Sequence, residues 1–216
     1  MLAYYIEGNL IAVLFSFIIY FSGRSSYAKN ETSQIIFNRM LVLLAVLSVF
    51  DFLSHFYAEK SRIIVEFSRL VYLILIAVGT YLWFLFILIK TNRVSNIKRT
   101  FGYTGGLLIF LLMTELFNPI TSFYFKVNAN AEYTVKLGIF FAWFVEWSYF
   151  IAAFIVNLIA VSREKSDYKK REYRGYLMFA LPMVFSSIPE MLFEGISTMQ
   201  VGFMFGLLLA FLNRQK

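Results

Sequence analysis

A chain of 216 residues with 60% hydrophobic and 20% aromatic residues has too few polar side chains to cover a soluble domain. It has no cysteine and one histidine, which excludes disulfides, thiolate metal sites, a cysteine nucleophile and zinc centres with several imidazole ligands. The formal net charge is +7, and in a membrane protein such an excess usually reports orientation rather than nucleic-acid binding. The composition predicts an integral membrane protein.

Seven apolar runs predict seven transmembrane helices, because a hydrocarbon core of about 30 Å needs about 20 residues per crossing. In chain order they cover residues 4–21, 35–56, 63–89, 101–116, 139–161, 176–193 and 196–211. Only Glu194 and Gly195 separate the last two runs, so a six-helix bundle with one re-entrant segment remains an alternative. The expected fold is an all-α bundle that uses residues 1–216 as a single domain.

Three local patterns qualify these helices. The connection 118–137 is the longest and is rich in aromatic residues, so we expect it at the membrane surface. Pro182 and Pro189 are expected to bend the sixth helix. Two Gly-x-x-x-Gly pairs permit close helix contacts, within the bundle or across a dimer, and they begin at Gly102 and Gly202.

Lysine and arginine collect on one side of the predicted bundle. If the N-terminus is outside, 15 of the 20 basic residues face the cytoplasm. They are Arg24, Lys29, Arg39, Lys90, Arg93, Lys98, Arg99, Arg163, Lys165, Lys169, Lys170, Arg171, Arg174, Arg214 and Lys216. Because basic residues resist translocation, this asymmetry predicts an external N-terminus and a cytoplasmic C-terminus.

Acidic residues inside the apolar runs are the main functional signal, because an ionisable group there costs about 2.5–3.5 kcal/mol on insertion scales. At 1.5 Å per residue, five acids on five helices lie about 21–24 Å above the inner boundary. They are Glu7, Asp51, Glu115, Glu146 and Glu190. We expect a layer of carboxylates that faces the bundle interior or a cavity open to the outside.

Other residues are expected to join this layer. Glu66, Arg69 and Tyr72 follow the spacing of one helical face. Trp143 and Trp147 flank Glu146 and offer rings for cation–π contacts. The expected ligand-binding set is Asp51, Glu115, Glu146, Glu190, Arg69, Glu66, Tyr72, Trp143 and Trp147. Five anions and one internal arginine leave three alternatives open: a cationic ligand, a metal ion, or acids that hold protons.

A simpler interpretation exists for several of these residues. Glu7 is explained equally by lipid headgroups, Glu190 by loop water, and the two tryptophans by an aromatic belt. His55 is expected at the interface, one turn from Asp51. Asn157 either extends a polar track inward or makes a helix–helix hydrogen bond.

Catalysis is not expected, and no catalytic residue, metal ligand or cofactor site is assigned. The last run has no lysine for a retinal Schiff base, and no phosphate-binding loop is present. One histidine cannot support a zinc hydrolase with several imidazole ligands. Three classes remain: a receptor for a small molecule, a small cation or solute transporter or channel built on the same acids, and a structural subunit without a ligand.

The last third of the chain resembles the seven-helix sensor region that precedes diguanylate cyclase (GGDEF) domains in many Gram-positive gut bacteria. The similarity is carried by Leu181-Pro182, by residues 188–197 and by residues 210–216, with support from Asp51 and from residues 81–84. The sequence departs from that pattern at Glu190, where a glutamine is expected.

This resemblance implies a multi-pass receptor module in the bacterial cytoplasmic membrane. An extracellular small molecule, cationic or polar, would bind in the outer pocket and shift the seventh helix. That shift would reach a cytoplasmic output domain, which is not among these 216 residues. Because such cyclases act as dimers, a homodimer is implied for the complete protein; no nucleic-acid partner is expected.

Overall fold

A computed structural model describes residues 2–26, 32–93, 97–192 and 198–214, and the side chains of 7–22, 32–93, 98–189 and 198–212. The described residues form ten helices and one two-stranded hairpin. In chain order these are α1 (Leu2–Ser26), α2 (Thr32–Phe56), α3 (Arg62–Lys90), α4 (Ile97–Thr104), α5 (Gly106–Leu116), α6 (Asn118–Thr121), β1 (Phe125–Val127), β2 (Tyr133–Val135), α7 (Gly138–Arg163), α8 (Asp167–Leu177), α9 (Ala180–Leu192) and α10 (Met199–Arg214). The mainly helical class expected from the sequence is confirmed.

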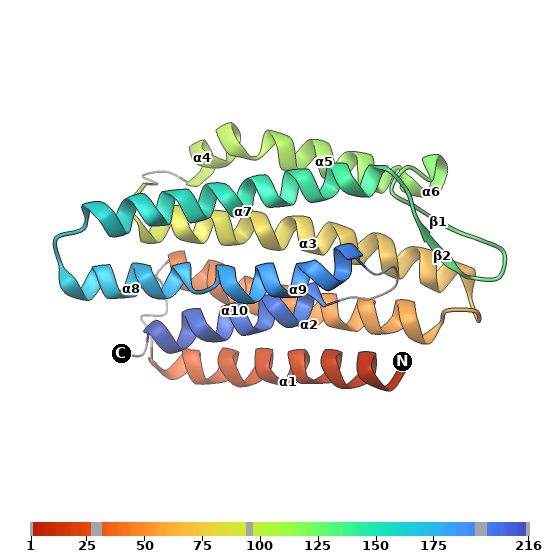
Figure 1. Cartoon of the computed structure of the whole chain (residues 1–216), viewed down its shortest axis with the longest axis horizontal. Coiled ribbons are helices and arrows are strands. Elements are labelled where there is room, and N and C mark those ends of the chain that lie inside the picture. The colour runs from red at the N-terminus through yellow and green to blue at the C-terminus, as the bar shows by residue number, and fades with distance from the viewer. Residues whose placement is uncertain (1, 27–31, 94–96, 193–197, 215–216) are drawn as a thin grey trace.

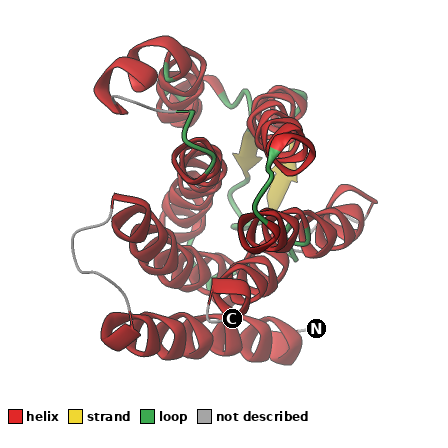
Figure 2. Cartoon of the chain, turned by 90° about the vertical axis from the view of Figure 1, so that its left-hand side faces the viewer, coloured by secondary structure: helices red, strands yellow, loops and turns green. Residues whose placement is uncertain are grey.

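The helices run along one common axis (Figure 1). The hairpin, the start of α1 and the α2–α3 connection lie at one end of the bundle, which we call the hairpin end. The α7–α8 connection and the end of α10 lie at the opposite end, which we call the tail end. Viewed from the tail end, the helices pack side by side around a common interior (Figure 2).

Three helices in the described residues are long and apolar enough to cross a membrane: α2, α3 and α7. Shorter apolar helical segments cover Glu7–Ser22, Gly106–Leu116 and Met199–Leu212. By length and composition the structure therefore marks three membrane spans rather than the seven expected, and it agrees with a membrane protein at that coarser level.

The fourth predicted helix, residues 101–116, is broken into α4 and α5 at Gly105. Tyr149 of α7 satisfies the backbone at the break, because its hydroxyl donates to the Thr104 carbonyl (2.6 Å) and accepts from the Leu108 N–H (3.0 Å). A side chain at Gly105 would strike the Phe101 carbonyl, which lies 2.6 Å from the position of a Cβ. The glycine and the tyrosine together allow an interrupted helix inside the bundle.

The sixth predicted helix, residues 176–193, is also interrupted. α8 ends at Leu177 and α9 begins at Ala180, which puts Pro182 in the first turn of α9. A proline there lacks an N–H that the helix does not need, whereas in one continuous helix its ring would meet the Met178 carbonyl. Pro189 lies inside α9. Phe193 and the expected start of the seventh helix at Ile196 lie outside the described residues.

The connection 118–137, which was expected at the membrane surface, contains α6 and an ordered hairpin. β1 and β2 pair antiparallel, with Phe125 opposite Val135 and Val127 opposite Tyr133. Asn118 is buried and supports the chain before β1: its Oδ1 accepts from the N–H groups of Tyr124 (2.7 Å) and Phe125 (3.2 Å). The sequence did not predict this hairpin because each strand has only three residues.

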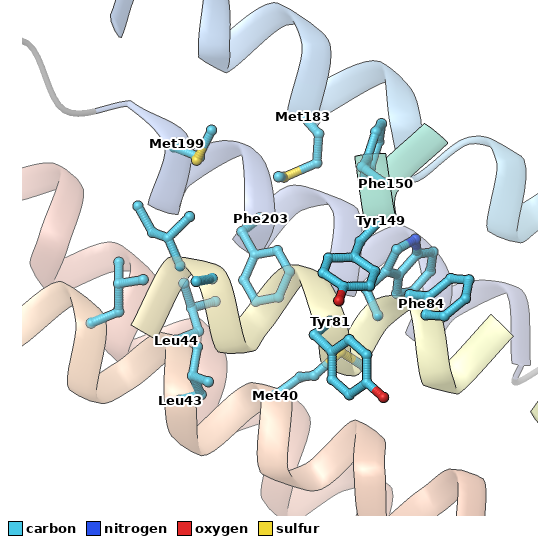
Figure 3. Close-up of a cluster of buried hydrophobic side chains, with 14 of the residues drawn as sticks. Met40, Leu43, Leu44, Tyr81, Phe84, Tyr149, Phe150, Met183, Met199 and Phe203 are labelled. Carbon is cyan, nitrogen blue, oxygen red and sulfur yellow. The ribbon is translucent and has the colours of Figure 1, made fainter. Parts of the chain in front are cut away.

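Aromatic and sulfur-containing side chains fill the middle of the bundle. In Figure 3, Met183 of α9, Phe203 of α10 and Phe150 of α7 belong to one cluster with side chains of α2 and α3. Trp83 of α3 stacks on Phe179, with 3.7 Å between ring centroids.

The two Gly-x-x-x-Gly pairs have different surroundings. A Cβ at Gly206 would overlap the Phe179 ring, and one at Gly202 would overlap Ser186, so this pair makes a close contact inside the bundle. A Cβ at Gly102 or Gly106 would meet nothing within 4 Å. The close intramolecular contact expected from the pattern therefore holds for the second pair only.

Candidate functional site

Asp51 lies at the centre of a buried polar cluster near the hairpin end. Its side chain is 0% exposed on α2, and its Oδ2 accepts hydrogen bonds from Asn9 Nδ2 of α1 (2.8 Å) and Gln200 Nε2 of α10 (3.1 Å). Buried carboxylates are stable only when such donors replace water. One side chain therefore links the first helix and the last helix to α2.

The other carboxylate oxygen of Asp51 faces α3. Its Oδ1 lies 3.7 Å from Arg69 Nη1 and 3.5 Å from His55 Nδ1. Arg69 Nη2 lies 3.1 Å from His55 Nε2, and because a guanidinium only donates, the imidazole accepts there. The proton of a neutral His55 is thereby assigned to Nδ1, which donates to the Asp51 carbonyl (2.9 Å). His55 is thus part of the cluster and not only an interfacial residue.

Two tyrosine rings border Arg69. Its guanidinium carbon lies 4.7 Å from the ring centroid of Tyr133 on β2 and 5.8 Å from that of Tyr72 on α3. Arg69 and Tyr72 are only 8% and 3% exposed. Cation–π contacts of this kind strengthen when water is excluded. The hairpin therefore contributes a wall to the cluster, which explains why an arginine is tolerated in the apolar α3.

A cavity of about 310 Å³ opens beside this cluster, between the hairpin and the adjoining ends of α2 and α3. It is lined by Ser54, His55, Ala58, Val65, Arg69, Ala131, Tyr133 and Val135. Its size lies at the lower end of the range of small-molecule pockets, about 300–1,000 Å³. Arg69 is the charged residue of this described lining, since Asp51 stands behind it in the protein interior.

The turn of the hairpin holds one wall of the cavity in a defined position. Ala131 lines the cavity with φ = 59°, a left-handed conformation that is uncommon for residues other than glycine. Asn128 fastens this turn, because its Oδ1 accepts from the backbone N–H groups of Asn130 and Glu132, both at 2.9 Å. Strained backbone of this kind often occurs at functional sites.

Glu115 and Glu146 are buried apart from this cavity. Glu115 on α5 is 0% exposed and neither of its carboxylate oxygens has a hydrogen-bond partner. Glu146 on α7 is 3% exposed and lines a crevice of about 10 Å³, room for about one water molecule. Burial raises the pKa of Tyr124, which lies in the connection before β1, and the charges of both glutamates raise it further. Neither acid is among the described residues that line the cavity.

Of the five acids predicted to form one layer, Asp51, Glu115 and Glu146 are buried and Glu7 is not. Glu7 is exposed on α1 and does not point into the bundle. Glu66 is partly exposed and pairs with Arg62, with 3.8 Å between Nε and Oε2. The side chain of Glu190 lies outside the described residues. Helix phase explains the difference, because equal height along a helix does not fix the direction in which a side chain points.

The two tryptophans are also placed differently from the expectation. Trp143 and Trp147 are partly buried and pack edge to face against Phe140 and Phe150. The cation of the candidate site, Arg69, contacts tyrosine rings and not these tryptophans. Trp147 does border the crevice beside Glu146, so it lies near one predicted acid but not near the larger cavity.

Sequence reasoning missed four contributors to the site: Asn9, Ser54, Tyr133 and Gln200. Asn9 and Gln200 lie within apolar runs. An amide side chain in such a run indicates a hydrogen-bond partner on another helix. Tyr133 carries no comparable signal, because its role depends on a hairpin that brings it over Arg69.

The tail end holds a different set of polar contacts. Asn157 of α7 is buried, and its Nδ2 donates to the Tyr173 carbonyl of α8 (3.0 Å), so the helix–helix hydrogen bond is the correct one of the two expectations for this residue. Lys90 at the end of α3 pairs with Glu172 (3.8 Å), which also accepts from the Tyr176 hydroxyl (2.5 Å). These contacts fasten α8 to α3 and α7.

Comparison with known proteins gives no assignment: no protein-family model, curated protein or solved structure matches the chain. Among the described side chains, no group of three or more His, Asp or Glu residues is placed to hold a metal ion. The candidate site is therefore defined by its own geometry, a small cavity with a guanidinium and an imidazole on its wall and a carboxylate behind them.

Proposed function

We propose that this chain is the ligand-binding membrane module of a receptor, which takes a small extracellular molecule into the cavity at the hairpin end. The observation that carries the proposal is a continuous set of contacts. Arg69 and His55 line the cavity, both face Asp51 Oδ1, and Asp51 Oδ2 accepts from Gln200 on α10. A molecule that engages the cavity wall therefore acts on the same carboxylate that holds the last helix.

The receptor would cross the membrane seven times. In this proposal α4 with α5 and α8 with α9 act as two interrupted crossings, and α1, α2, α3, α7 and α10 as five others. The hairpin end faces the outside and the tail end the cytoplasm, since α8, which is rich in lysine and arginine, lies at the tail end. The N-terminus is then outside and the C-terminus inside.

Signal transfer follows from the position of Gln200. Ligand contact with Arg69 changes the balance of charges around Asp51 and favours a different distance between Asp51 and Gln200, which displaces α10. α10 ends at the tail end, where the resemblance to GGDEF-associated sensor regions places an output domain. A ligand signals only if it binds one arrangement of α10 more tightly than the other.

The proposal is tested with a fluorescent reporter on α10. Because the chain has no cysteine, Leu212→Cys, on the exposed face near the end of α10, takes a single thiol-reactive dye without further substitutions. The labelled protein in lipid nanodiscs is titrated with benzoate, benzamide and benzamidine, three planar molecules that differ in charge. We expect at least one to raise the melting temperature and to change the dye emission.

Gln200→Leu is the informative variant, because it cuts the contact between Asp51 and α10 but leaves the cavity lining intact. It should keep the ligand-induced rise in melting temperature and lose the change in emission. An emission change that persists in this variant would contradict the proposed relay. Net uptake of the same molecules into liposomes would instead identify a transporter.

A further inference from the structure

We propose that the cavity at the hairpin end binds a small carboxylate with a compact apolar body, rather than the cationic ligand that the acidic residues of the sequence suggest. This inference rests on the receptor function proposed above and names its ligand class. The charge of the described cavity wall carries it: the wall includes one guanidinium, that of Arg69, and no carboxylate.

Asp51 does not occupy the position that the ligand needs. It is fully buried behind Arg69, and the 3.7 Å between Arg69 Nη1 and its Oδ1 exceeds the length of an N–H···O hydrogen bond. The amides of Asn9 and Gln200 donate hydrogen bonds to its other oxygen, Oδ2. Arg69 lies beside Asp51, donates from Nη2 to His55, and contributes the guanidinium of the cavity lining.

A carboxylate suits a single guanidinium better than other anions do. The two oxygens of a carboxylate match the two parallel N–H groups of arginine, and the pair forms strong charge-assisted hydrogen bonds. Ser54 and His55 also line the cavity, and they are oriented by the cluster: the Ser54 hydroxyl donates to the Asp51 carbonyl (2.8 Å), and the His55 ring contacts that carbonyl and Arg69. A phosphate dianion would bring two negative charges to a cavity whose described lining has one arginine.

The remaining walls favour an apolar body on the ligand. Val65, Val135, Ala58 and Ala131 also line the cavity, and Tyr133 adds an aromatic ring. A volume of about 310 Å³ admits a molecule with one or two rings or a short branched chain, not a peptide or a sugar chain. A small aromatic or branched carboxylate meets both requirements.

The test compares benzoate, benzamide and benzamidine, which share a planar shape and carry a charge of minus one, zero and plus one. Their affinities for the unmodified chain in nanodiscs are measured by calorimetric titration. We expect benzoate to bind about tenfold more tightly than benzamide, the difference that one charge-assisted hydrogen-bonded pair supplies. Benzamidine should bind most weakly of the three.

Variants then locate the binding site. The double substitution Asp51→Asn with Arg69→Gln removes the guanidinium without leaving a buried carboxylate uncompensated, and should abolish the preference for benzoate over benzamide. Arg62→Gln is the matched control, because it removes an exposed arginine from the same helix away from the cavity. It should preserve the preference. If the double variant does not fold, the preference of the unmodified chain among the three molecules still tests the carboxylate assignment.

Equal affinities, tighter binding of benzamidine, or binding of none of the three at millimolar concentration would overturn the carboxylate assignment. So would a preference for benzoate that survives in the folded double variant. The receptor function fails on a different readout, the emission of the dye on α10. Tight benzamidine binding with a changed emission would reject the ligand class and keep the receptor.

Discussion

The two ends of the bundle handle buried polar groups in different ways. At the hairpin end, Asp51, Arg69 and His55 form a network beside a cavity of about 310 Å³. At the tail end, Asn157 and Glu172 hold neighbouring helices together, and the cavity next to Asn157 measures only about 10 Å³. Polar groups at the tail end fasten helices, whereas those at the hairpin end also reach a space that a small molecule can enter.

This difference fits a receptor that receives its ligand at one end only. A packed core of aromatic residues lies between the two ends and includes the Trp83–Phe179 stack (Figure 3 shows part of it). Well-packed interiors transmit displacement because they compress little. In the proposed receptor, a change at Asp51 would reach the tail end as a shift of α10.

The largest effect should come from Asp51→Ala. It leaves Arg69 buried without its partner charge and removes the acceptor of Asn9 and Gln200, so we expect a loss of about 3–5 kcal/mol in the free energy of unfolding. Denaturation in detergent, followed by circular dichroism, measures it. Asp51→Asn with Arg69→Gln should recover part of this loss. A change below about 1 kcal/mol for Asp51→Ala would show that the cluster is not coupled.

Substitution of Glu115 should have the opposite effect on stability. Its buried carboxyl oxygens have no hydrogen-bond partner, so Glu115→Leu removes a group that is costly to bury and puts an apolar side chain of similar size in its place. We expect stability to rise by about 1–3 kcal/mol. The same denaturation assay measures the gain. A loss of similar size would indicate that Glu115 binds something in the folded protein.

The tail end should be less sensitive than Asp51. Glu172→Gln removes the charge that faces Lys90 but keeps an oxygen that can accept from Tyr176. Because both partners of the ion pair are partly exposed, we expect a loss of no more than about 1 kcal/mol. Benzoate affinity should stay unchanged in this variant. Altered affinity would show that the two ends are not separate in function.

The smallest expected effect concerns the hairpin turn. Ala131 has a positive φ, so Ala131→Gly relieves backbone strain and should raise the melting temperature slightly, by the equivalent of about 1 kcal/mol or less. The neighbouring Ala129→Gly, an exposed control in the same turn, should not stabilise the protein. Equal effects at both positions would argue against strain at Ala131.

Sequence reasoning anticipated a mainly helical fold and the burial of Asp51, Glu115 and Glu146, because apolar runs and charges within them are local signals. It did not anticipate the directions of the side chains. Glu7 and Asp51 were assigned similar heights, yet only Asp51 points inward, since helix rotation is set by packing with other helices. The hairpin that supplies Tyr133 and Ala131 was missed for a related reason: strands of three residues are defined by their pairing and not by composition.

Labelling of single cysteines on intact cells tests the central claim, an outward-facing cavity at the hairpin end, most directly. Val135→Cys lies on the cavity wall, Thr134→Cys is exposed on the same strand, and Tyr168→Cys is exposed on α8 at the tail end. With a membrane-impermeant thiol reagent we predict that the first two react from outside, that benzoate slows only Val135→Cys, and that Tyr168→Cys reacts only after permeabilisation. External labelling of Tyr168→Cys together with protection of both strand positions would contradict the proposed orientation and the cavity's access to the outside.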